Sequence, residues 1–280
     1  CRYCHFQDKQ NGDSSFSRNQ LSMIIENIHE YCEKNGLRKF KLGIVGAGEP
    51  MLNFEELLFI VDYVKCKKYD EIHTYTITNG TLMTEEKLKK LFEYRDVLKI
   101  CFSLDGYEEL HNLGRQNFAK VIEAIQCYGR IYGCAPSINA TVNKQSYLNK
   151  EKVIDFFIGN GLHEVTFSIL VGCDDDSLYI SGDEYKEFMD YVKNSDVVSR
   201  QFNSEKKYDC TMYGNYCGVG RTNMFIAPEG IFPCGRFYKM KDFYLGSCEV
   251  SFGQLQMAVE RYIPVRDGSC YFKEKVEAHR

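Results

Sequence analysis

The sequence predicts an α/β fold, either a barrel or an open part of one, and three features carry this prediction. First, short and nearly continuous apolar runs alternate with longer amphipathic segments over most of the 280 residues. Such runs are typical of parallel strands covered by helices. Second, glycine, asparagine or serine follows several of the runs, where strand-to-helix turns are expected. Third, the pattern changes after about residue 174 to shorter β-like pieces.

The first expected element is an amphipathic helix that begins after Ser17, a suitable N-cap, and ends near Lys34, with Gly36 as its stop. Strands and helices then alternate. The expected strands are Phe40–Val45, Ile72–Thr78, Val97–Ser103, Ser137–Val142 and Val165–Val171. The expected helices are Phe54–Lys67, Glu85–Tyr94, Phe118–Ile131 and Lys150–Gly159. Right-handed crossovers would curl these units into a partial (β/α)6 barrel of the TIM type.

The C-terminal part is expected to begin with a helix at Gly182–Asn194 and to continue in short strands. Residues 223–234 predict a β-hairpin whose Pro-Glu-Gly turn returns the chain to Cys234. This part is too small to bury a large core, so we expect metal binding to stabilise it.

Ligands of such a barrel bind at the carboxyl ends of its strands. Four polar or glycine-rich segments are expected at this rim: Gly46–Pro50, Thr78–Gly80, Ser103–Gly106 and Asn139. Each segment alone is explained equally well as a turn that needs Gly or Asn. Their shared position favours a ligand site.

The composition argues against two classes of partner. The formal net charge is −4 and no long Lys/Arg cluster occurs, so we expect neither nucleic acid nor an anionic membrane as a partner. No run of about 18 apolar residues and no signal-peptide pattern is found, which favours a cytoplasmic location. The acidic run Asp174–Asp176 is interpreted as a solvated loop rather than a metal site.

The 13 cysteines are an odd number, which does not suit a closed disulfide framework. Cys32, Cys66, Cys101 and Cys127 fall in apolar-periodic segments and are interpreted as small buried hydrophobic residues. Candidate thiolate ligands lie beside Gly, Pro and polar residues: Cys1, Cys4, Cys210, Cys217, Cys234, Cys248 and Cys270. A set rich in Cys favours iron–sulfur clusters, while spacing alone also permits zinc, and the first Cys-x-x-Cys alone also permits a redox pair. Cys134 and Cys173 are not assigned.

Several motifs carry a resemblance to a known family. They are Cys1–Cys4 (CRYC), Gly46–Pro50 (GAGEP), Thr78–Leu82 (TNGTL), Ser103–Gly106 (SLDG) with His111 and Arg115, Ser137–Val142 (SINATV) and the hairpin region Cys217–Cys234. Together they resemble radical S-adenosylmethionine (SAM) enzymes of the SPASM/Twitch group, which include anaerobic sulfatase-maturating enzymes and maturases of ribosomally made peptides (RiPPs). The resemblance implies a radical SAM partial barrel over residues 1–195 and a SPASM/Twitch-like auxiliary cluster domain over residues 196–280.

The resemblance also implies the cofactors and their ligands. Cys1 and Cys4 would bind a catalytic [4Fe–4S] cluster, with a third cysteine expected four residues before Cys1. S-adenosyl-L-methionine would contact the backbone of Gly48, the carboxylate of Glu49, the ribose-binding Ser103 and the carboxylate-binding Arg115. Tyr3 and Leu170, which we place on the sixth strand, would lie near the adenine. Without the resemblance, Arg115 would be read as an ordinary surface arginine.

One or two auxiliary [4Fe–4S] clusters are implied for the C-terminal part. Cys210, Cys217 and Cys234 match the first three auxiliary ligands, and Cys270 would begin the later cysteine set. Cys248 has no clear counterpart. After Cys270 no further cysteine follows, and Gly235 stands where sulfatase-maturating enzymes carry an aspartate.

The expected function is that of a radical SAM oxidoreductase that uses a 5′-deoxyadenosyl radical to abstract hydrogen from a peptide side chain, with a thioether or C–C crosslink as product. The expected partners are a peptide or protein substrate and a reductant such as flavodoxin or ferredoxin. Three alternatives remain open: a formylglycine-forming sulfatase maturase, a small-molecule radical SAM dehydrogenase, and a non-catalytic metal- or peptide-binding protein. No catalytic residue is identified from the sequence.

Overall fold

The computed structural model describes residues 1–4, 15–45, 48–170, 173, 175–197, 216–262, 266–267 and 270–272. The chain divides into two compact units. The first unit contains residues 1–5, 43–53 and 75–205, and the second contains residues 6–42, 54–74 and 206–280. The units therefore do not follow a single cut in the sequence, and the expected boundary near residue 195 stays a prediction.

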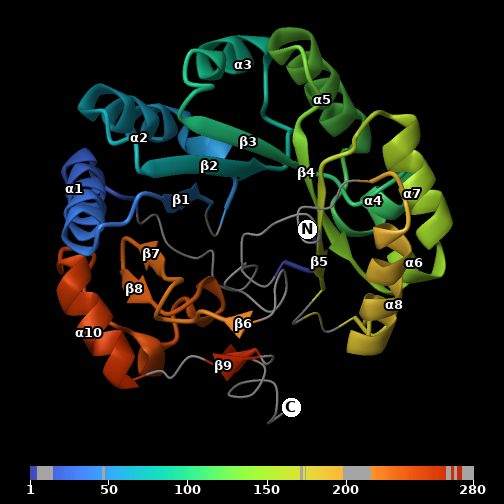
Figure 1. Ribbon diagram of the computed structural model, residues 1–280. Coiled ribbons are helices and arrows are strands. Elements are labelled where there is room, and N and C mark those ends of the chain that lie inside the picture. The colour runs from blue at the N-terminus through green and yellow to red at the C-terminus, as the bar shows by residue number, and fades with distance from the viewer. Residues whose placement is uncertain are drawn as a thin grey trace. The chain divides into compact units, whose positions relative to one another are not determined.

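A five-stranded sheet has the order β1-β2-β3-β4-β5, so each strand neighbours the next one along the chain (Figure 1). The strands are β1 (Phe40–Ile44), β2 (Ile72–Thr78), β3 (Leu98–Ser103), β4 (Ser137–Val142) and β5 (Val165–Ile169). Strands β3 and β4 are parallel, as are β4 and β5. The predicted α/β fold is confirmed, although the described residues contain five strands of this sheet where the (β/α)6 expectation has six.

Helices in the first unit cover strands that are buried along nearly their whole length. These helices are α3 (Glu85–Phe92), α4 (Glu108–Gly114), α5 (Phe118–Tyr132), α6 (Lys144–Leu148), α7 (Lys150–Gly159) and α8 (Gly182–Lys193). Phe167 of β5 contacts Phe157 of α7 and Phe188 of α8 edge-on, with ring centroids 5.8 and 5.3 Å apart. All three rings are fully buried, and each contributes about 1.5–3 kcal/mol by leaving water.

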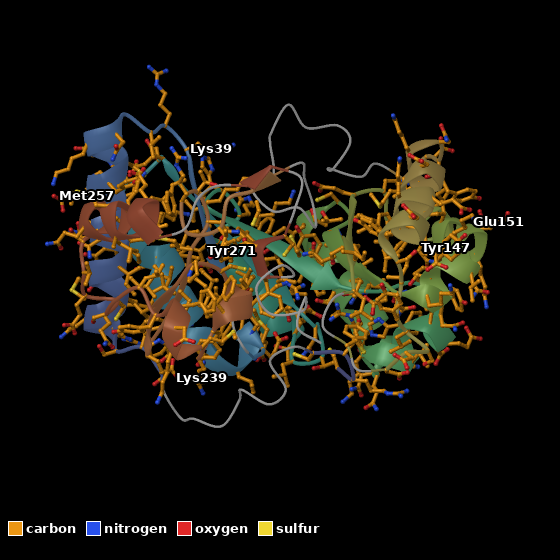
Figure 2. The ribbon with its side chains drawn as sticks, turned by 90° about the horizontal axis from the view of Figure 1, so that it is seen from below. Lys39, Tyr147, Glu151, Lys239, Met257 and Tyr271 are labelled. Carbon is orange, nitrogen blue, oxygen red and sulfur yellow. The ribbon has the colours of Figure 1, made fainter. Side chains whose placement is uncertain are left out.

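In the second unit, α1 (Arg18–Asn35) packs against α2 (Phe54–Lys67) and α10 (Phe252–Tyr262). Helix α1 begins as expected, because the Ser17 side chain and Gln20 form a reciprocal capping box. It ends at Gly36, which has φ of 61°, a left-handed conformation that costs glycine little. In Figure 2 the labelled Lys39 and Met257 lie at the periphery, whereas Tyr271 is buried.

The C-terminal part contains two small antiparallel pairs, β6 (Tyr216–Cys217) with β9 (Arg266–Asp267) and β7 (Phe225–Ala227) with β8 (Gly230–Phe232). The second pair confirms the predicted hairpin around the Pro-Glu-Gly turn. Two 3-10 turns follow it, Gly235–Phe237 and Lys241–Phe243. A further 3-10 turn, Pro50–Asn53, lies between β1 and α2.

The structure adds the short helices α4 and α6, which the sequence pattern did not predict. Both are too short to display a helical apolar period. No helix among the described residues is long and apolar enough to span a membrane.

Candidate functional site

The carboxylate of Glu49 lies at the carboxyl end of β2 and is held by neutral donors alone among the described residues. One oxygen accepts from the Thr78 hydroxyl at 2.6 Å and from the Met51 N–H at 3.1 Å, and the other accepts from the Asn79 N–H at 2.8 Å. The Asn79 side chain in turn accepts from the Thr81 N–H at 2.9 Å, which closes an Asx turn. The turn therefore presents a negative charge that no cation of the described residues compensates.

Gly48, next to this carboxylate, is exposed and has open space around it. A Cβ built at this position would meet no heavy atom within 4 Å outside its chain neighbours. The backbone at Gly48 is therefore accessible to a polar ligand. A cationic amino group beside Glu49 would find both a carboxylate and bare backbone, so this turn fits the amino end of S-adenosylmethionine.

A second carboxylate, Asp105, follows β3 and is almost fully buried. Its Oδ1 and Oδ2 accept from Nε of Arg115 at 2.9 and 3.0 Å, and Oδ1 also accepts from the Thr141 N–H at 2.9 Å. The Tyr3 hydroxyl donates to Oδ2. Burial and the Asp105 charge hold the pKa of Tyr3 well above its ordinary value, so the phenol keeps its proton and acts as the donor.

The guanidinium of Arg115 is fixed on three sides. Beyond Asp105, its Nη2 donates to the Thr141 hydroxyl at 3.0 Å, and its Nη1 lies 3.8 Å from Sγ of Cys1. Its Cζ lies 5.5 Å from the centroid of the Tyr3 ring. Burial lowers the pKa of Arg115, but Asp105 and Tyr3 raise it more strongly, so the side chain remains a cation.

The backbone that carries Arg115 is bent sharply after α4. Gln116 and Asn117 both adopt positive φ, 73° and 60°, which is uncommon for residues other than glycine. His111 holds this bend: its Nδ1 accepts from the Asp105 N–H at 3.4 Å and its Nε2 faces the Gln116 carbonyl at 3.2 Å. The contact with an N–H at Nδ1 assigns the proton to Nε2, and burial lowers the pKa of His111.

The Cys1–Cys4 segment is attached to the end of α4. The Arg2 N–H donates to the Gly114 carbonyl at 2.8 Å, and the Arg2 guanidinium lies 3.0 Å from the Asp175 carboxylate. A Cβ at Gly114 would lie 2.1 Å from Cε1 of Tyr3, so glycine is needed here to let the tyrosine ring approach. The segment that carries Cys1 and Cys4 is thereby brought to Arg115.

Two further predicted ligands lie at the ends of strands. Ser103 is the last residue of β3, is 7% exposed, and is paired in register with Asn139. Leu170 is buried and donates its N–H to the Val142 carbonyl at 2.8 Å. We expected Leu170 on a sixth strand, and this was wrong. The described sheet has five strands, and Leu170 directly follows the fifth, which ends at Ile169. The roles assigned to Ser103 and Leu170 remain predictions.

The structure also identifies residues that the sequence reasoning did not assign. Asp105, Thr141, Thr78 and Gly114 make the contacts that hold the predicted ligands in place. Asp105, Thr78 and Thr141 stood in recognised motifs, but no sequence feature showed which side chain each one would meet. Gly114 carried no signal, because its partner lies more than a hundred residues away along the chain.

In the second unit, two of the predicted auxiliary ligands, Cys217 and Cys270, act electrostatically on a third, Cys234. Burial raises the pKa of the Cys234 thiol, and the neighbouring Cys270 and Cys217 add to the rise, while Arg236 opposes it through its N–H and its charge. Cys217 is buried, and Cys234 and Cys270 are half-buried. Cys210 lies outside the described residues. Sulfur donors of this kind suit iron–sulfur clusters or zinc.

Within the described ranges, no three His, Cys, Asp or Glu side chains come together as a metal-ion site. Cys1 and Cys4 therefore supply two thiolates without a third from the described part of the chain.

Of the cysteines interpreted as buried, Cys32, Cys101 and Cys127 are buried, but Cys66 is exposed. The prediction for Cys66 was wrong because its position falls on the solvent side of α2. Cys248 is buried, Cys134 is exposed and Cys173 is half-buried.

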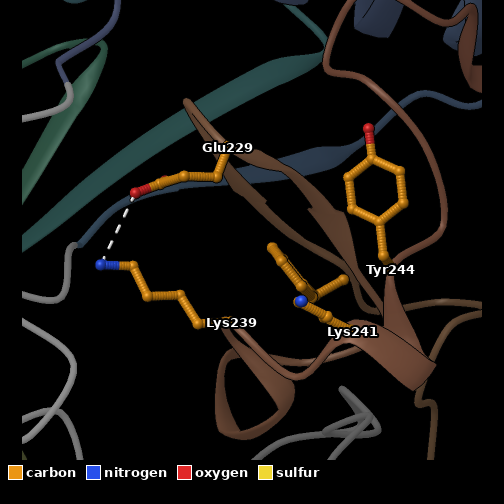
Figure 3. Close-up of a pocket in the computed structure, with 5 residues that line it drawn as sticks. Glu229, Lys239, Lys241 and Tyr244 are labelled. Atoms are coloured by element: carbon orange, nitrogen blue, oxygen red, sulfur yellow. Dashed lines mark ion pairs between the residues drawn. The ribbon is translucent and has the colours of Figure 1, made fainter. Parts of the chain in front are cut away.

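A hollow of about 330 Å³ lies beside the β7–β8 hairpin (Figure 3). It is lined by Glu229, Phe232, Lys239, Lys241 and Tyr244. Glu229 pairs with Lys239 at 3.8 Å and also accepts from the Tyr238 hydroxyl at 2.9 Å. The one carboxylate of the hollow is therefore already paired, and none of the predicted ligands lines the hollow.

Comparison with known proteins gives a family match and two relatives. Residues 1–133 match the family model described as the radical SAM superfamily. The chain is 25% identical over 178 residues to an uncharacterized protein of Methanocaldococcus jannaschii, with 61% of this chain and 58% of that protein covered. It is 28% identical over 263 residues to the antilisterial bacteriocin subtilosin biosynthesis protein AlbA of Bacillus subtilis, with 88% and 54% covered. The chain thus spans little more than half the length of these two relatives.

Two solved structures share the fold. One is anSMEcpe with bound AdoMet, with a TM-score of 0.74, 19% identity, and coverage of 94% of this chain and 79% of that chain. The other is Streptococcus suis SuiB bound to the precursor peptide SuiA, with a TM-score of 0.66, 18% identity, and coverage of 91% and 61%. The sheet is therefore the α/β partial barrel of these proteins, and residues 1–133 carry a radical SAM domain.

Proposed function

We propose that this chain is a peptide or protein maturase that removes hydrogen from a substrate side chain and forms a thioether or carbon–carbon crosslink. The observation that carries the proposal is the alignment of 88% of the chain with AlbA, a protein of bacteriocin biosynthesis. Two structures of the same fold contain a bound peptide, which supports a peptide substrate for this chain. They are SuiB with its precursor peptide SuiA, and anSMEcpe with AdoMet and the Kp18Cys peptide.

In this proposal the rim residues bind the cofactors. Cys1 and Cys4 hold the catalytic [4Fe–4S] cluster, and Glu49 and the Gly48 backbone receive the amino group of S-adenosylmethionine. Arg115 faces the methionine carboxylate with the N–H groups that Asp105 and Thr141 leave available. When bound, these cofactors supply the radical that abstracts hydrogen from the substrate.

We further propose that residues 1–195 form the catalytic part and residues 196–280 an auxiliary domain with one or two [4Fe–4S] clusters. This assignment is supported by the order of Cys217, Cys234 and Cys270 along the chain and by the effect of Cys217 and Cys270 on the pKa of Cys234. A reductant such as flavodoxin or ferredoxin and a reducing, cytoplasmic location complete the proposal, because free thiolates persist under reducing conditions.

Crosslinking is favoured over formylglycine formation by Gly235, which provides no carboxylate after Cys234. A deprotonation at this point requires a base within hydrogen-bond reach of the reacting group. The nearest acid along the chain before Cys234, Glu229, is already engaged by Lys239 and Tyr238. A bond to a substrate cysteine does not need that base, because a metal site can hold the thiol as its thiolate.

The test is tandem mass spectrometry of the partner peptide after incubation with reconstituted protein, S-adenosylmethionine and reductant, followed by iodoacetamide. We expect a product about 2 Da lighter, with an internal bond and 5′-deoxyadenosine released. A free aldehyde at Ser or Cys would show formylglycine chemistry instead. Release of 5′-deoxyadenosine that does not depend on peptide would show a small-molecule substrate.

Two cysteine variants provide matched controls. Cys4→Ala should abolish both the product and 5′-deoxyadenosine, because it removes a proposed cluster ligand. Cys66→Ala should retain both, because Cys66 is an exposed residue of α2. Iron and zinc quantitation of the same preparations then separates iron–sulfur protein from zinc protein. Zinc without iron would refute the proposed function.

A further inference from the structure

One buried carboxylate joins the segment carrying Cys1 and Cys4 to the arginine at the sheet rim. Asp105 is 2% exposed, and an ionised group at that depth is stable only with well-placed partners. Its partners come from three separate parts of the chain: the Tyr3 hydroxyl, Nε of Arg115 and the Thr141 N–H. Every partner is a donor, so the site is built for an acceptor that carries a negative charge.

These contacts decide which way Arg115 faces. A guanidinium has five N–H groups in one plane. The Nε–H is taken by Asp105, and one Nη2–H is taken by the Thr141 hydroxyl. The Nη1 group is then directed to the side on which Sγ of Cys1 lies, 3.8 Å away. A rotation of the plane would break the bonds to Asp105 and Thr141 together.

The same carboxylate also fixes the Cys1–Cys4 segment through Tyr3. The phenol donates to Asp105 while the ring lies against Gly114 and below the guanidinium. Tyr3 stands directly before Cys4, so a tyrosine held in place restricts where the neighbouring thiol can lie.

We propose that Asp105 is a positioning residue that orients Arg115 and the Cys1–Cys4 segment together, before any cofactor binds. It does not touch the cofactor in this proposal. Its effect passes through Tyr3 and Arg115, and it deepens the proposed function by explaining how residues more than a hundred positions apart become one binding site. The inference rests on the proposed binding of S-adenosylmethionine but not on the identity of the peptide.

The test measures binding and segment order rather than turnover, in the full native polypeptide. Asp105→Asn keeps the size of the side chain but removes the charge, and we expect S-adenosylmethionine affinity of the reconstituted protein to fall about tenfold or more. Hydrogen exchange at the backbone of residues 1–4 should become faster in the cofactor-free variant. The change in the electron paramagnetic resonance spectrum that S-adenosylmethionine causes should also weaken.

A second variant keeps the test decisive where Asp105→Asn does not fold. Thr141→Val is nearly isosteric and removes the hydroxyl that accepts from Nη2 of Arg115 and also interacts with Tyr3, and it should lower the affinity about threefold. Asp190→Asn, an exposed aspartate on α8, is the matched control and should change neither readout. Native affinity in a folded Asp105→Asn protein, or in Thr141→Val, would overturn the inference. An unmodified peptide with the affinity losses intact would refute the proposed function and leave this inference standing.

Discussion

Two carboxylates lie at the same edge of the sheet and have opposite surroundings. Glu49 is half-exposed, and among the described residues it accepts only from a hydroxyl and two backbone N–H groups. Asp105 is buried and accepts from a guanidinium, a phenol and a backbone N–H. The charge of Asp105 is compensated by Arg115, whereas that of Glu49 is not compensated by any residue in the described part of the chain.

This difference is the one expected between an acid that binds a ligand, as we propose for Glu49, and an acid that stabilises the fold. Glu49 can be neutralised only by a cation from outside the described part of the chain, as a cofactor amino group would provide. Asp105 already has its cation and therefore stabilises the fold and orients Arg115. Substitutions at the two sites should consequently separate cofactor affinity from stability.

The largest effect is expected for Arg115→Ala. Removing the guanidinium leaves the buried Asp105 without its cation, and breaking a buried ion pair from one side costs about 3–5 kcal/mol of unfolding free energy. Affinity for S-adenosylmethionine should also weaken, by about 1.5–3 kcal/mol, if the charge-assisted bonds form. Chemical denaturation and titration calorimetry measure the two effects.

The control for Arg115→Ala is Lys99→Ala. Lys99 pairs with Glu164 at 3.0 Å, but both side chains are more than a third exposed. Solvent screens such a pair, and its loss should cost only about 0.2–1 kcal/mol. Equal destabilisation by the two variants would show that the Arg115–Asp105 pair is not the structural anchor we describe.

Glu49→Gln should weaken cofactor affinity more than it lowers stability, the reverse of what we expect for Arg115→Ala. The amide keeps an acceptor for the turn, so we expect a stability loss of only about 0.5–1.5 kcal/mol. Cofactor affinity should fall by about 1.5–3 kcal/mol, because the charge opposite the amino group is lost. Titration calorimetry on the reconstituted protein measures this. A variant that binds normally but unfolds easily would place Glu49 among the structural acids.

Much of the fold could be predicted from the sequence because its signals are local. The cap at Ser17, the stop at Gly36 and the apolar runs of the five strands each specify structure within a few residues. Helix α4 was not predicted, because seven residues display no clear period. Cys66 was misplaced because an apolar helix segment does not reveal which residues face solvent.

The site could be predicted only in part, because several of the contacts that form it join residues far apart in the sequence. Motifs identified Glu49 and Ser103 near strand ends and Arg115 in the segment after the third strand, and the parallel sheet explains why the loops that follow its strands share an edge. The partners of Arg115 could not be predicted, since the contact of Asp105 with Tyr3 joins positions 102 residues apart. Gly114 gives no signal in the sequence, although the Tyr3 ring needs the space beside it.

Gly114→Ala tests the packing that carries Tyr3 to Asp105. The new Cβ would lie 2.1 Å from the ring, so Tyr3 must move, and overpacking of this kind costs about 1–3 kcal/mol. Gly129→Ala in α5 is the control, since its Cβ would have no neighbour closer than 3.9 Å. It should be neutral or stabilising by up to about 1 kcal/mol. Thermal unfolding compares them, and equal midpoints would contradict the close approach.

The smallest expected effect is the pH dependence contributed by His111. Burial lowers its pKa, Asp105 raises it less strongly, Arg115 lowers it further, and the Gln116 carbonyl raises it. The neutral ring accepts at Nδ1 from the Asp105 N–H, so a proton added there would face another donor. Between the lowered pKa of the folded state and the ordinary value of about 6.5, the unfolded chain binds more protons than the folded one. The contribution of the neutral His111 ring to the free energy of unfolding is therefore complete above about pH 6.5 and is lost as the pH falls below it.

His111→Gln should remove this contribution, because the amide can accept from Asp105 and donate to Gln116 without titrating. The difference in unfolding free energy between about pH 7.5 and about pH 5.5, measured by denaturation in urea, should become smaller in the variant than in the parent protein. His163→Gln, at an exposed position, should leave that difference unchanged. If His111→Gln and the parent lose the same stability on acidification, the ring does not hold the bend after Arg115 in its neutral form. The rigid orientation of Arg115 would then depend on Asp105 and Thr141 alone.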